Sequence, residues 1–417
     1  MKILLTSIGT RGDIEPFLAV GAILQRNGHE IIYSFPSQFS SIIPEKGNFH
    51  PLSPRVIQLI ESKEGQTVMG KAGWWKKAKA LSYLYKEGQK INEELITTHY
   101  ETVKAENPDI IIHNAKCSYP TLWGLDQNKP TILLSPVPFF IHSVKGHPHI
   151  GFNKNLGSWI NKLTYSLSNF GLTKTIYDGQ KFLPERFNYS KSIIKTELLT
   201  KKIIFSIAPA LFSRPDYWPK NAQVLGFNER EKPTTWKPDK SLEQFLTIHS
   251  KVLFLTFGSM VNSNPEQTSR CIYQALAELH IPTIVNTASG GLLKLPAFSR
   301  NKNFHFVENI PYQWIFKRVY AVIHHGGSGT THSALKHGCA SMIIPHIIDQ
   351  FGWSSLVQEL KLGPKGISIN KISTDHLKKP IEALWADETY KENARKLASS
   401  MSNENMEERL LAFIFEG

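Results

Sequence analysis

The sequence has few cysteines and no long apolar run. Only three of its 417 residues are cysteine (Cys117, Cys271 and Cys339), which excludes a disulfide-built scaffold and favours a reducing compartment such as the cytoplasm. No run approaches about 18 uninterrupted apolar residues, so we expect no membrane-spanning helix. The apolar residues 2–6 are followed by Gly9 and no cleavage-type stretch, so they are interpreted as a buried strand rather than a signal peptide.

Acidic residues are in the minority. The chain has 35 Asp and Glu against 48 Lys and Arg, a net charge of +13, and its 41% of hydrophobic residues exclude a disordered chain. An excess of this size suits an anionic partner such as a nucleotide, a nucleic acid or a membrane surface. The sequence has no helix-turn-helix, zinc or RNA-recognition signature, so we expect no nucleic-acid partner.

Two series of short apolar runs, each run followed by a turn and a helical pattern, predict βαβ units around parallel sheets. The runs are 2–6, 30–34, 110–113 and 131–135 in the first series, and 201–208, 251–257, 283–286, 304–307, 321–324 and 341–345 in the second. The fold class is therefore α/β, with two Rossmann-like doubly wound domains.

Composition also predicts the domain boundaries. Residues 214–240 are rich in proline, tryptophan and charge, as an interdomain linker is, and separate an N-terminal domain (1–213) from a C-terminal domain (241–389). Residues 390–417 are helical by composition, and we expect them to pack across the two domains.

A glycine turn follows the first run, in the segment Ser7-Ile-Gly-Thr-Arg-Gly-Asp13. Gly9 and Gly12 would let the backbone approach a ligand at the carboxyl end of the sheet. The alternative is an ordinary tight turn in which Asp13 caps a helix over residues 15–27. The turn lacks the third glycine of a dinucleotide fingerprint.

Two later turns carry phosphate-binding chemistry. Ser259 follows an apolar strand in Phe-Gly-Ser, although many ordinary turns contain Gly-Ser. The stronger segment is His324-His-Gly-Gly-Ser-Gly-Thr-Thr-His332, where three glycines would expose N–H groups at a helix start and His325 and Thr330 could bond phosphate oxygens. A metal site at His324, His325 and His332 is the rival, but no Cys or carboxylate joins them.

Asp349 and Gln350 come just beyond the next strand, in Pro345-His-Ile-Ile-Asp-Gln350. Their adjacent acceptors and donors suit the neighbouring hydroxyls of a sugar. An ordinary polar helix start is the alternative, and the position of this pair downstream of the glycine loop favours the sugar.

These segments together resemble the UDP-glycosyltransferase superfamily with two Rossmann-like domains facing each other across a cleft (GT-B type), particularly its sterol glucosyltransferases and bacterial antibiotic glycosyltransferases. The shared features are the donor signature from Asn309 to Gln350, the start Gly9–Pro16, Arg214–Pro219 and the Phe-Gly-Ser ending at Ser259. The resemblance covers residues 1 to about 377 and weakens between about 53 and 200.

The resemblance implies a role for each matching residue. It implies that Asp13 is the catalytic base and that Asp349 and Gln350 hold the sugar. Those expected at the donor diphosphate are His325, Gly327, Ser328, Gly329, Thr330, Ser259, Gly9, Thr10 and Gly12; those expected along the uridine are Asn309, Ile310, Pro311 and Gln313. Asn114 and Trp74 are expected in the acceptor pocket. Phe139 and Phe140, at the end of a predicted strand, are expected either in the wall of that pocket or in the core.

The implied reaction is an inverting transfer of a hexose from a UDP-sugar to a hydroxyl of a lipophilic acceptor (sterol, polyketide, carotenoid or phenolic). Glucose is the hexose that the resemblance favours. No Asp-x-Asp carboxylate pair is present, so we expect metal-independent transfer with no cofactor. Many relatives use a His oriented by an Asp, whereas the matching positions here are Asp13 and Asn114, and no such dyad is available.

Part of the positive charge is concentrated. Residues 142–202 carry ten Lys and Arg against three acids, a net charge of +7, and residues 71–79 combine two tryptophans with four lysines. Aromatic residues beside lysine suit a membrane headgroup region, so peripheral contact with the anionic inner face of a membrane is one hypothesis, and an ordinary solvated helix face is the other.

The sequence is also compatible with other functions. On the same fold, the chain could transfer N-acetylglucosamine to a lipid or epimerise a UDP-sugar. A chain of a different class would be a non-catalytic sensor of a nucleotide-sugar or a lipid.

Overall fold

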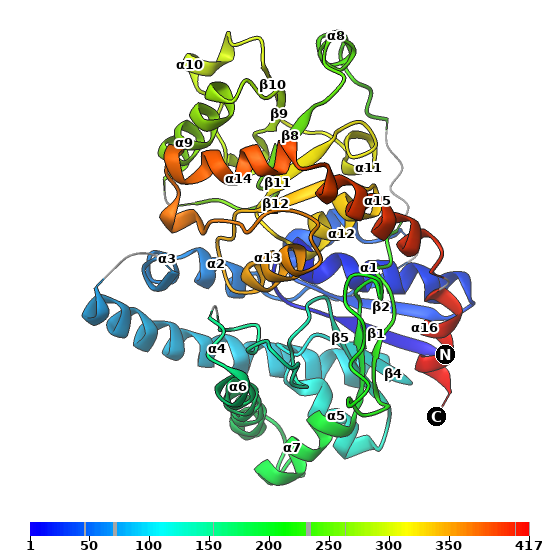
Figure 1. Cartoon of the computed structure of the whole chain (residues 1–417). Coiled ribbons are helices and arrows are strands. Elements are labelled where there is room, and N and C mark those ends of the chain that lie inside the picture. The colour runs from blue at the N-terminus through cyan, green and yellow to red at the C-terminus, as the bar shows by residue number, and fades with distance from the viewer. Residues whose placement is uncertain are drawn as a thin grey trace. The chain divides into compact units, whose positions relative to one another are not determined.

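The computed structural model describes residues 1–45, 47–69, 73–152, 154–230, 235–262, 264–404 and 406–416. The chain divides into two compact units (Figure 1). Unit 1 comprises Met1–Pro209, Ser213–Arg230 and Asn405–Gly417, and unit 2 comprises Ala210–Phe212 and Glu231–Glu404. Each unit is built on one parallel sheet, which confirms the predicted α/β class.

Unit 1 has a seven-stranded sheet in the order β3-β2-β1-β4-β5-β6-β7. Its strands are β1 (Lys2–Thr6), β2 (Glu30–Ser34), β3 (Asn48–Phe49), β4 (Ile110–His113), β5 (Thr131–Ser135), β6 (Lys202–Phe205) and β7 (Ala222–Val224). Its helices are α1 (Arg11–Arg26), η1 (Ser37–Ile42), α2 (Arg55–Glu61), α3 (Lys63–Met69), α4 (Trp74–Glu106), α5 (Tyr119–Gln127), α6 (Ser158–Gly179), η2 (Gln180–Phe182), α7 (Lys191–Thr200) and α16 (Met406–Phe415).

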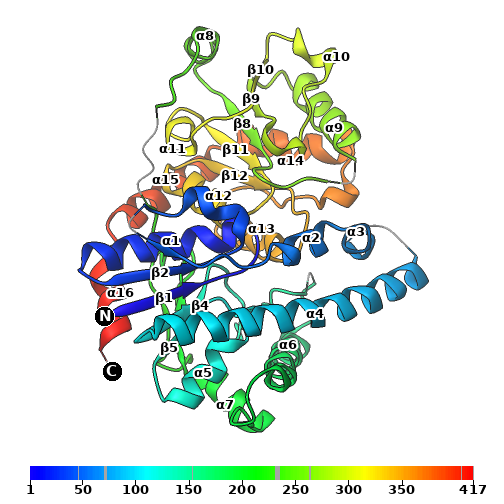
Figure 2. The ribbon, with the colours of Figure 1, turned by 180° about the vertical axis from the view of Figure 1, so that it is seen from behind.

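Alternate residues of each strand in unit 1 face opposite layers of helices. Ile3 and Leu5 of β1 pack with α1 and α16. Leu4, between them, packs with α4, α5, α6 and α7 on the other face (Figure 2). Both faces of a parallel sheet are therefore covered, which explains why its strands are continuous apolar runs in the sequence.

Unit 2 has a five-stranded sheet in the order β10-β9-β8-β11-β12. Its strands are β8 (Leu253–Thr256), β9 (Thr283–Asn286), β10 (Phe304–Val307), β11 (Ala321–His324) and β12 (Ala340–Ile343). Its helices are α8 (Lys240–Ile248), α9 (Pro265–Glu278), η3 (Ala288–Gly290), α10 (Pro296–Ser299), α11 (Tyr312–Ile315), α12 (Ser328–Lys336), α13 (Asp349–Glu359), η4 (Ile369–Lys371), α14 (Thr374–Ala386) and α15 (Glu388–Ser402). One face packs on α9 and α14, and the other on α8, α11 and α12.

Three expectations differ from the structure in detail. Residues 202–205, in the run that was expected to open the second series, form β6 and pair with β5 in the sheet of unit 1. Helix α1 begins at Arg11 rather than residue 15, because the turn at Thr10 already caps it. The predicted linker 214–240 loses its first part to unit 1, where residues 222–224 pair with β6 as an edge strand. Residues 231–234 of that linker, with Pro233, lie outside the described residues.

The C-terminal segment 390–417 is divided between the units rather than forming one helix. Helix α15 packs on α12 in unit 2. Helix α16 places Leu410 and Ile414 in the core of unit 1. Within the described part of the chain, no helix has both the length and the apolar character needed to cross a bilayer.

Candidate active site

The glycine loop of unit 2 joins β11 to α12. Gly326 has φ +94°, and a Cβ there would lie 2.6 Å from the Ile343 side chain, so only glycine fits. Gly327 is the N-cap of α12, and Ser328, Gly329 and Thr330 form its first turn. The first N–H groups of a helix have no partner within the helix, and the helix dipole favours an anion beside them. The loop is therefore built to bind a negatively charged group.

His325 is held inside this loop. Its side chain is buried, and burial, followed by the neighbouring His324 and His346, holds its pKa well below the usual value. The ring occupies space that glycines leave open, because a Cβ at Gly327 would lie 2.5 Å from Nε2 and a Cβ at Gly258 would lie 3.0 Å from Cε1. A neutral imidazole keeps one N–H, which can donate to a phosphate oxygen.

His346 lies beside His325 and was not predicted as a site residue. It follows β12, and its ring is 6.5 Å from that of His325 and 4.6 Å from that of Phe257. Nδ1 donates to the Ile344 carbonyl at 2.9 Å, and burial lowers the pKa of His346 to about 4. Its place between the strand and Asp349-Gln350 was the signal that could have identified it.

Gln350 is buried and organises the loop before α13. Its Oε1 accepts the backbone N–H groups of His346, at 2.6 Å, and Ile347, at 3.2 Å. This oxygen is therefore engaged within the protein, and the amide nitrogen is the part of Gln350 that could reach a sugar. Asp349 is the first residue of α13 and is half-buried.

The residues predicted to contact the diphosphate and the uridine differ in their exposure to solvent. Ser259 is exposed after β8, beside Gly258, whose φ is +57°. Asn309 and Gln313 are exposed, and the Asn309 carbonyl accepts Trp236 Nε1 at 3.0 Å. Ile310 points into the core and Pro311 caps α11, so these two could offer only backbone atoms to a base.

In unit 1, the turn after β1 holds the Asp13 carboxylate by both oxygens. Oδ2 accepts the Thr10 backbone N–H at 2.8 Å and its hydroxyl at 3.3 Å. Oδ1 accepts Lys116 Nζ at 2.8 Å. Gly9 is buried, and Thr10 and Gly12 are exposed in the same turn. Asp13 therefore both caps α1, as one interpretation predicted, and carries a charge at the carboxyl edge of the sheet.

Lys116 was missed from the sequence. It lies three residues beyond the end of β4, the strand that pairs with β1, so the two turns meet at one edge of the sheet. Asn114 is buried between them and its Oδ1 accepts the Lys116 N–H at 2.9 Å. The sequence signal that could have identified Lys116 is a cation in the turn that follows the strand next to β1.

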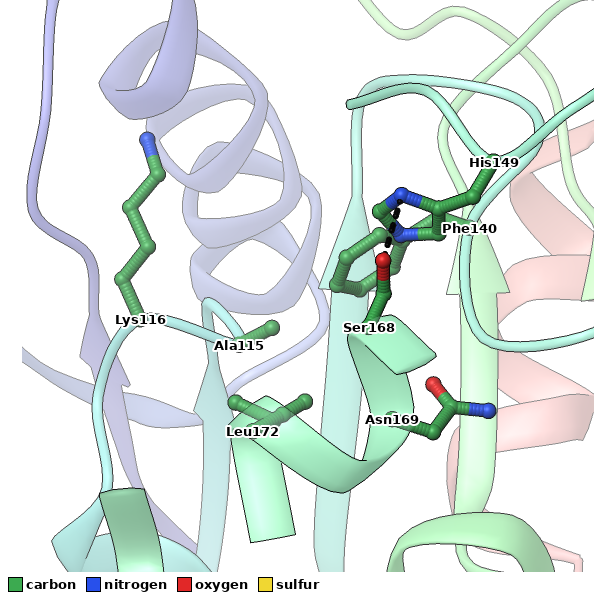
Figure 3. Close-up of a pocket in the computed structure, with 7 residues that line it drawn as sticks. All are labelled: Ala115, Lys116, Phe140, His149, Ser168, Asn169 and Leu172. Atoms are coloured by element: carbon green, nitrogen blue, oxygen red, sulfur yellow. Dashed lines mark hydrogen bonds between the residues drawn. The ribbon is translucent and has the colours of Figure 1, made fainter. Parts of the chain in front are cut away.

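A cavity of about 170 Å³ opens beside this turn, within unit 1 (Figure 3). Its lining residues come from the β4–α5 loop, the segment after β5 and helix α6: Ala115, Lys116, Phe140, His149, Ser168, Asn169 and Leu172. Ser168 Oγ and His149 Nδ1 are 3.0 Å apart on its wall. A volume of this size is about that of one six-membered ring.

The aromatic residues predicted for the acceptor pocket do not lie together in the structure. Phe140 lines the cavity. Phe139 has φ +58°, is buried and stacks on His147 with ring centroids 4.2 Å apart. Trp74 is 66% exposed at the start of α4 and stacks on Trp75. The structure thus places one of these three aromatic residues at the cavity.

The geometry does not support the rival metal site at His324, His325 and His332. His332 Nδ1 contacts the Ser328 carbonyl at 2.8 Å, as expected for a histidine within a helix. Over the described ranges, no three His, Cys, Asp or Glu side chains gather closely enough to hold a metal ion.

Comparisons with known proteins match both ends of the chain. Residues 3–122 match the glycosyltransferase family 28 N-terminal domain, and residues 274–410 match the erythromycin biosynthesis protein CIII-like C-terminal domain. A sterol 3-beta-glucosyltransferase of Arabidopsis thaliana is 26% identical over 97% of this chain and 66% of its own length. One of Saccharomyces cerevisiae is 23% identical over 96% of this chain and 34% of its own length. The chain thus spans less than two thirds of these relatives.

A solved structure shares the fold along the whole chain. The calicheamicin glycosyltransferase CalG4 superposes with a TM-score of 0.71 at 15% identity, covering 100% of this chain and 98% of that one. These comparisons indicate the same family as the glycine loop and the Asp13 turn do. They comprise family matches at both ends, relatives along nearly all of the chain and a common fold. The chain belongs to the UDP-glycosyltransferase superfamily of GT-B fold.

Proposed function

We propose that this chain transfers a hexose, glucose in the first instance, from UDP to a hydroxyl of a lipophilic acceptor, with inversion and without a metal. The observation that carries the proposal is the glycine loop that opens α12 around the neutral, buried His325. The relatives named sterol 3-beta-glucosyltransferases support glucose as the sugar and a lipophilic alcohol as the acceptor.

In the proposed reaction the acceptor oxygen forms a bond to the anomeric carbon while the bond from that carbon to the diphosphate oxygen breaks. The electron pair leaves with UDP, and the hydroxyl proton passes to the Asp13 carboxylate as the new bond forms. The proposal thus assigns the base to unit 1 and the donor to unit 2.

Fixed dipoles would stabilise the departing diphosphate. The first N–H groups of α12, the His325 N–H and the Ser259 hydroxyl are neutral donors, and preorganised donors stabilise developing charge without a covalent step. Asp349 and the amide nitrogen of Gln350 would hold sugar hydroxyls. Together with the lack of an Asp-x-Asp pair, these donors support metal-independent transfer.

We also propose that unit 1 contacts an anionic membrane. Helix α6 is apolar on its outward face: Trp159, Leu163, Leu167 and Phe170 are 74%, 46%, 61% and 59% exposed. Its inward face includes the polar residues Asn161, Thr164 and Thr173, the reverse of the usual pattern for a surface helix. An outward apolar stripe of this kind suits the boundary between headgroups and acyl chains.

Helix α4 extends this surface. Trp74, Trp75 and Tyr85 are 66%, 71% and 59% exposed on its first half, and Tyr85 interacts with Lys174 of α6. Exposed lysines border the two helices, at positions 76, 79, 154, 162 and 181. Lysines near an anionic surface contribute about 1 kcal/mol each, which favours acidic lipid. Lys71, part of the predicted region 71–79, lies outside the described residues.

The membrane proposal is tested by co-sedimentation with neutral vesicles and with vesicles containing acidic lipid. We expect binding only to the acidic vesicles, and a loss of at least about tenfold in the Leu167→Ser, Phe170→Ser variant, because the inserted apolar area falls. The control is Ile248→Ser, Val261→Ser, two exposed apolar residues of unit 2. Equal loss in the control, or equal binding to both vesicles, would contradict the proposal.

For the compartment we propose the reducing cytoplasm, at the inner face of the membrane. All three cysteines are buried and unpaired, and acidic lipid is concentrated on the cytoplasmic leaflet. Fractionation of cells that carry the tagged chain would test this.

The activity is tested with a matrix of UDP-glucose, UDP-galactose, UDP-N-acetylglucosamine and dTDP-sugars against a panel of lipophilic alcohols, scored by product mass with and without a chelator. We expect glucosylated product in both conditions. Product only from UDP-N-acetylglucosamine, an epimerised donor, or donor binding without consumption of any acceptor would support the alternative functions instead. Loss of product in chelator would contradict the metal-free mechanism.

A further inference from the structure

Asp13, the proposed catalytic base, forms an ion pair with Lys116. Lys116 Nζ lies 2.8 Å from Asp13 Oδ1, although the two residues are 103 positions apart in the sequence. Asp13 is 20% exposed and Lys116 is 50% exposed, so the pair is accessible from one side. It is also adjacent to the cavity, because Lys116 lines the cavity wall.

The loop that carries Lys116 is fixed to the strand that carries Asp13. The Asn114 N–H donates to the Thr6 carbonyl at 3.0 Å, which ties the end of β4 to the end of β1. The Asn114 side-chain oxygen Oδ1 accepts the Lys116 backbone N–H at 2.9 Å. The Asn114 backbone carbonyl accepts the Cys117 N–H, also at 2.9 Å. Asn114 therefore shapes the turn from which the lysine reaches the carboxylate, and it does not itself replace the missing dyad partner.

Gly9 leaves room for the pair. A Cβ at Gly9 would lie 2.1 Å from Asp13 Oδ2 and 2.9 Å from Lys116 Nζ. Real Cβ atoms do not approach other atoms so closely, so any other residue at position 9 would displace both charged groups. The φ of +134° at Gly9 also disfavours other residues there.

Stability does not account for this arrangement. An ion pair whose lysine is half exposed contributes little to folding, because water screens it and two side chains lose freedom. The carboxylate is already anchored by the Thr10 N–H through Oδ2. The additional contact of Lys116 fixes the direction of the second carboxylate oxygen, Oδ1.

We propose that Lys116 is the positioning residue for Asp13, taking the place of the histidine–aspartate dyad. Its ammonium holds the carboxylate in the orientation that receives the acceptor's proton. The inference depends on the proposed transfer reaction, with Asp13 as its base. Misplacing a reacting group by about 1 Å can cost about 100-fold in rate, so one such contact can be decisive.

The test measures transfer kinetics and UDP affinity for Lys116→Met, which keeps the length of the side chain without the charge, and for Lys116→Arg. We expect Lys116→Met to lower kcat between about tenfold and 100-fold, with the donor KM, the UDP affinity and the melting temperature unchanged. Lys116→Arg should recover most of the loss. Lys90→Met is the matched control, since Lys90 forms an exposed ion pair with Glu87 elsewhere in unit 1.

A double-mutant cycle with Asp13→Asn separates positioning from direct contact with substrate. If Lys116 acts through Asp13, Lys116→Met costs nothing further in the Asp13→Asn background. An additive loss, a kcat within twofold of the unsubstituted chain, or no recovery by arginine would overturn the inference. Full activity of Asp13→Asn alone would instead overturn the proposed base, and no transfer by the unsubstituted chain would overturn both.

Discussion

The imidazole of His325 occupies the space where Gly327 has no side chain: a Cβ there would lie 2.5 Å from Nε2. We therefore expect Gly327→Ala to displace the ring and weaken UDP binding about as much as His325→Ala does. Each single variant should lose about tenfold, because one hydrogen bond to a charged group contributes about 1.5 kcal/mol or more. The double variant should lose little more than either one, since both remove the same contact. Calorimetric titration with UDP measures all three.

The Asp13 carboxylate can be neutralised without loss of its cap on α1. In Asp13→Asn the amide oxygen can still accept the Thr10 N–H that Oδ2 accepts at 2.8 Å. We expect kcat to fall by about 10²–10⁴, the usual contribution of a general base, with UDP affinity unchanged. Asp13→Ala would also lose the cap and about 1 kcal/mol of stability. Turnover of Asp13→Asn near that of the unsubstituted chain would remove Asp13 from the mechanism.

Lys201 makes the stability of unit 1 rise with pH in the alkaline range. It is buried against the Thr121 and Thr131 hydroxyls, at 3.0 and 3.1 Å, and burial lowers its pKa to about 8. Between pH 8 and about 10.5 the unfolded chain holds the proton more tightly than the folded one, so the free energy of unfolding rises with pH, by up to about 1.4 kcal/mol per pH unit.

Lys201→Met should remove this rise. The measurement is urea unfolding of both proteins at pH 7.5 and 10, and the difference between their pH dependences isolates Lys201 from other groups that titrate there. The same pH dependence in both proteins would show that Lys201 does not titrate in this range.

His346 makes the stability of unit 2 rise with pH in the same sense, but in the acid range. Burial lowers its pKa to about 4, below the usual 6.5, so the stability is complete above about pH 6.5 and is lost as the pH falls towards 4. His346→Asn keeps a donor for the Ile344 carbonyl and cannot take up this proton. We expect its free energy of unfolding to fall less between pH 7 and 5, by about 1 to 2 kcal/mol. Proton uptake on unfolding, measured at pH 5.5, should be lower by nearly one.

Local patterns in the sequence determined most of the fold. The strands at residues 2–6, 30–34, 110–113, 131–135, 283–286, 304–307 and 321–324 lie where the apolar runs predicted them. Strands covered on both faces must be continuously apolar, and each ends at a turn residue, so both signals are local. The glycine loop around His325 could be recognised for the same reason, because its chemistry lies within one short segment.

The tertiary structure alone decided which distant residues share a site. Lys116 meets Asp13 because β4 pairs with β1, an order that the sequence of elements does not specify. Phe140 reaches the cavity while Phe139 enters the core, since the positive φ at Phe139 redirects the backbone between them. Residues 222–224 became a strand because β6 offered an unpaired edge. Such contacts depend on the pairing of separate segments, whereas strands and turns depend on neighbours along the chain.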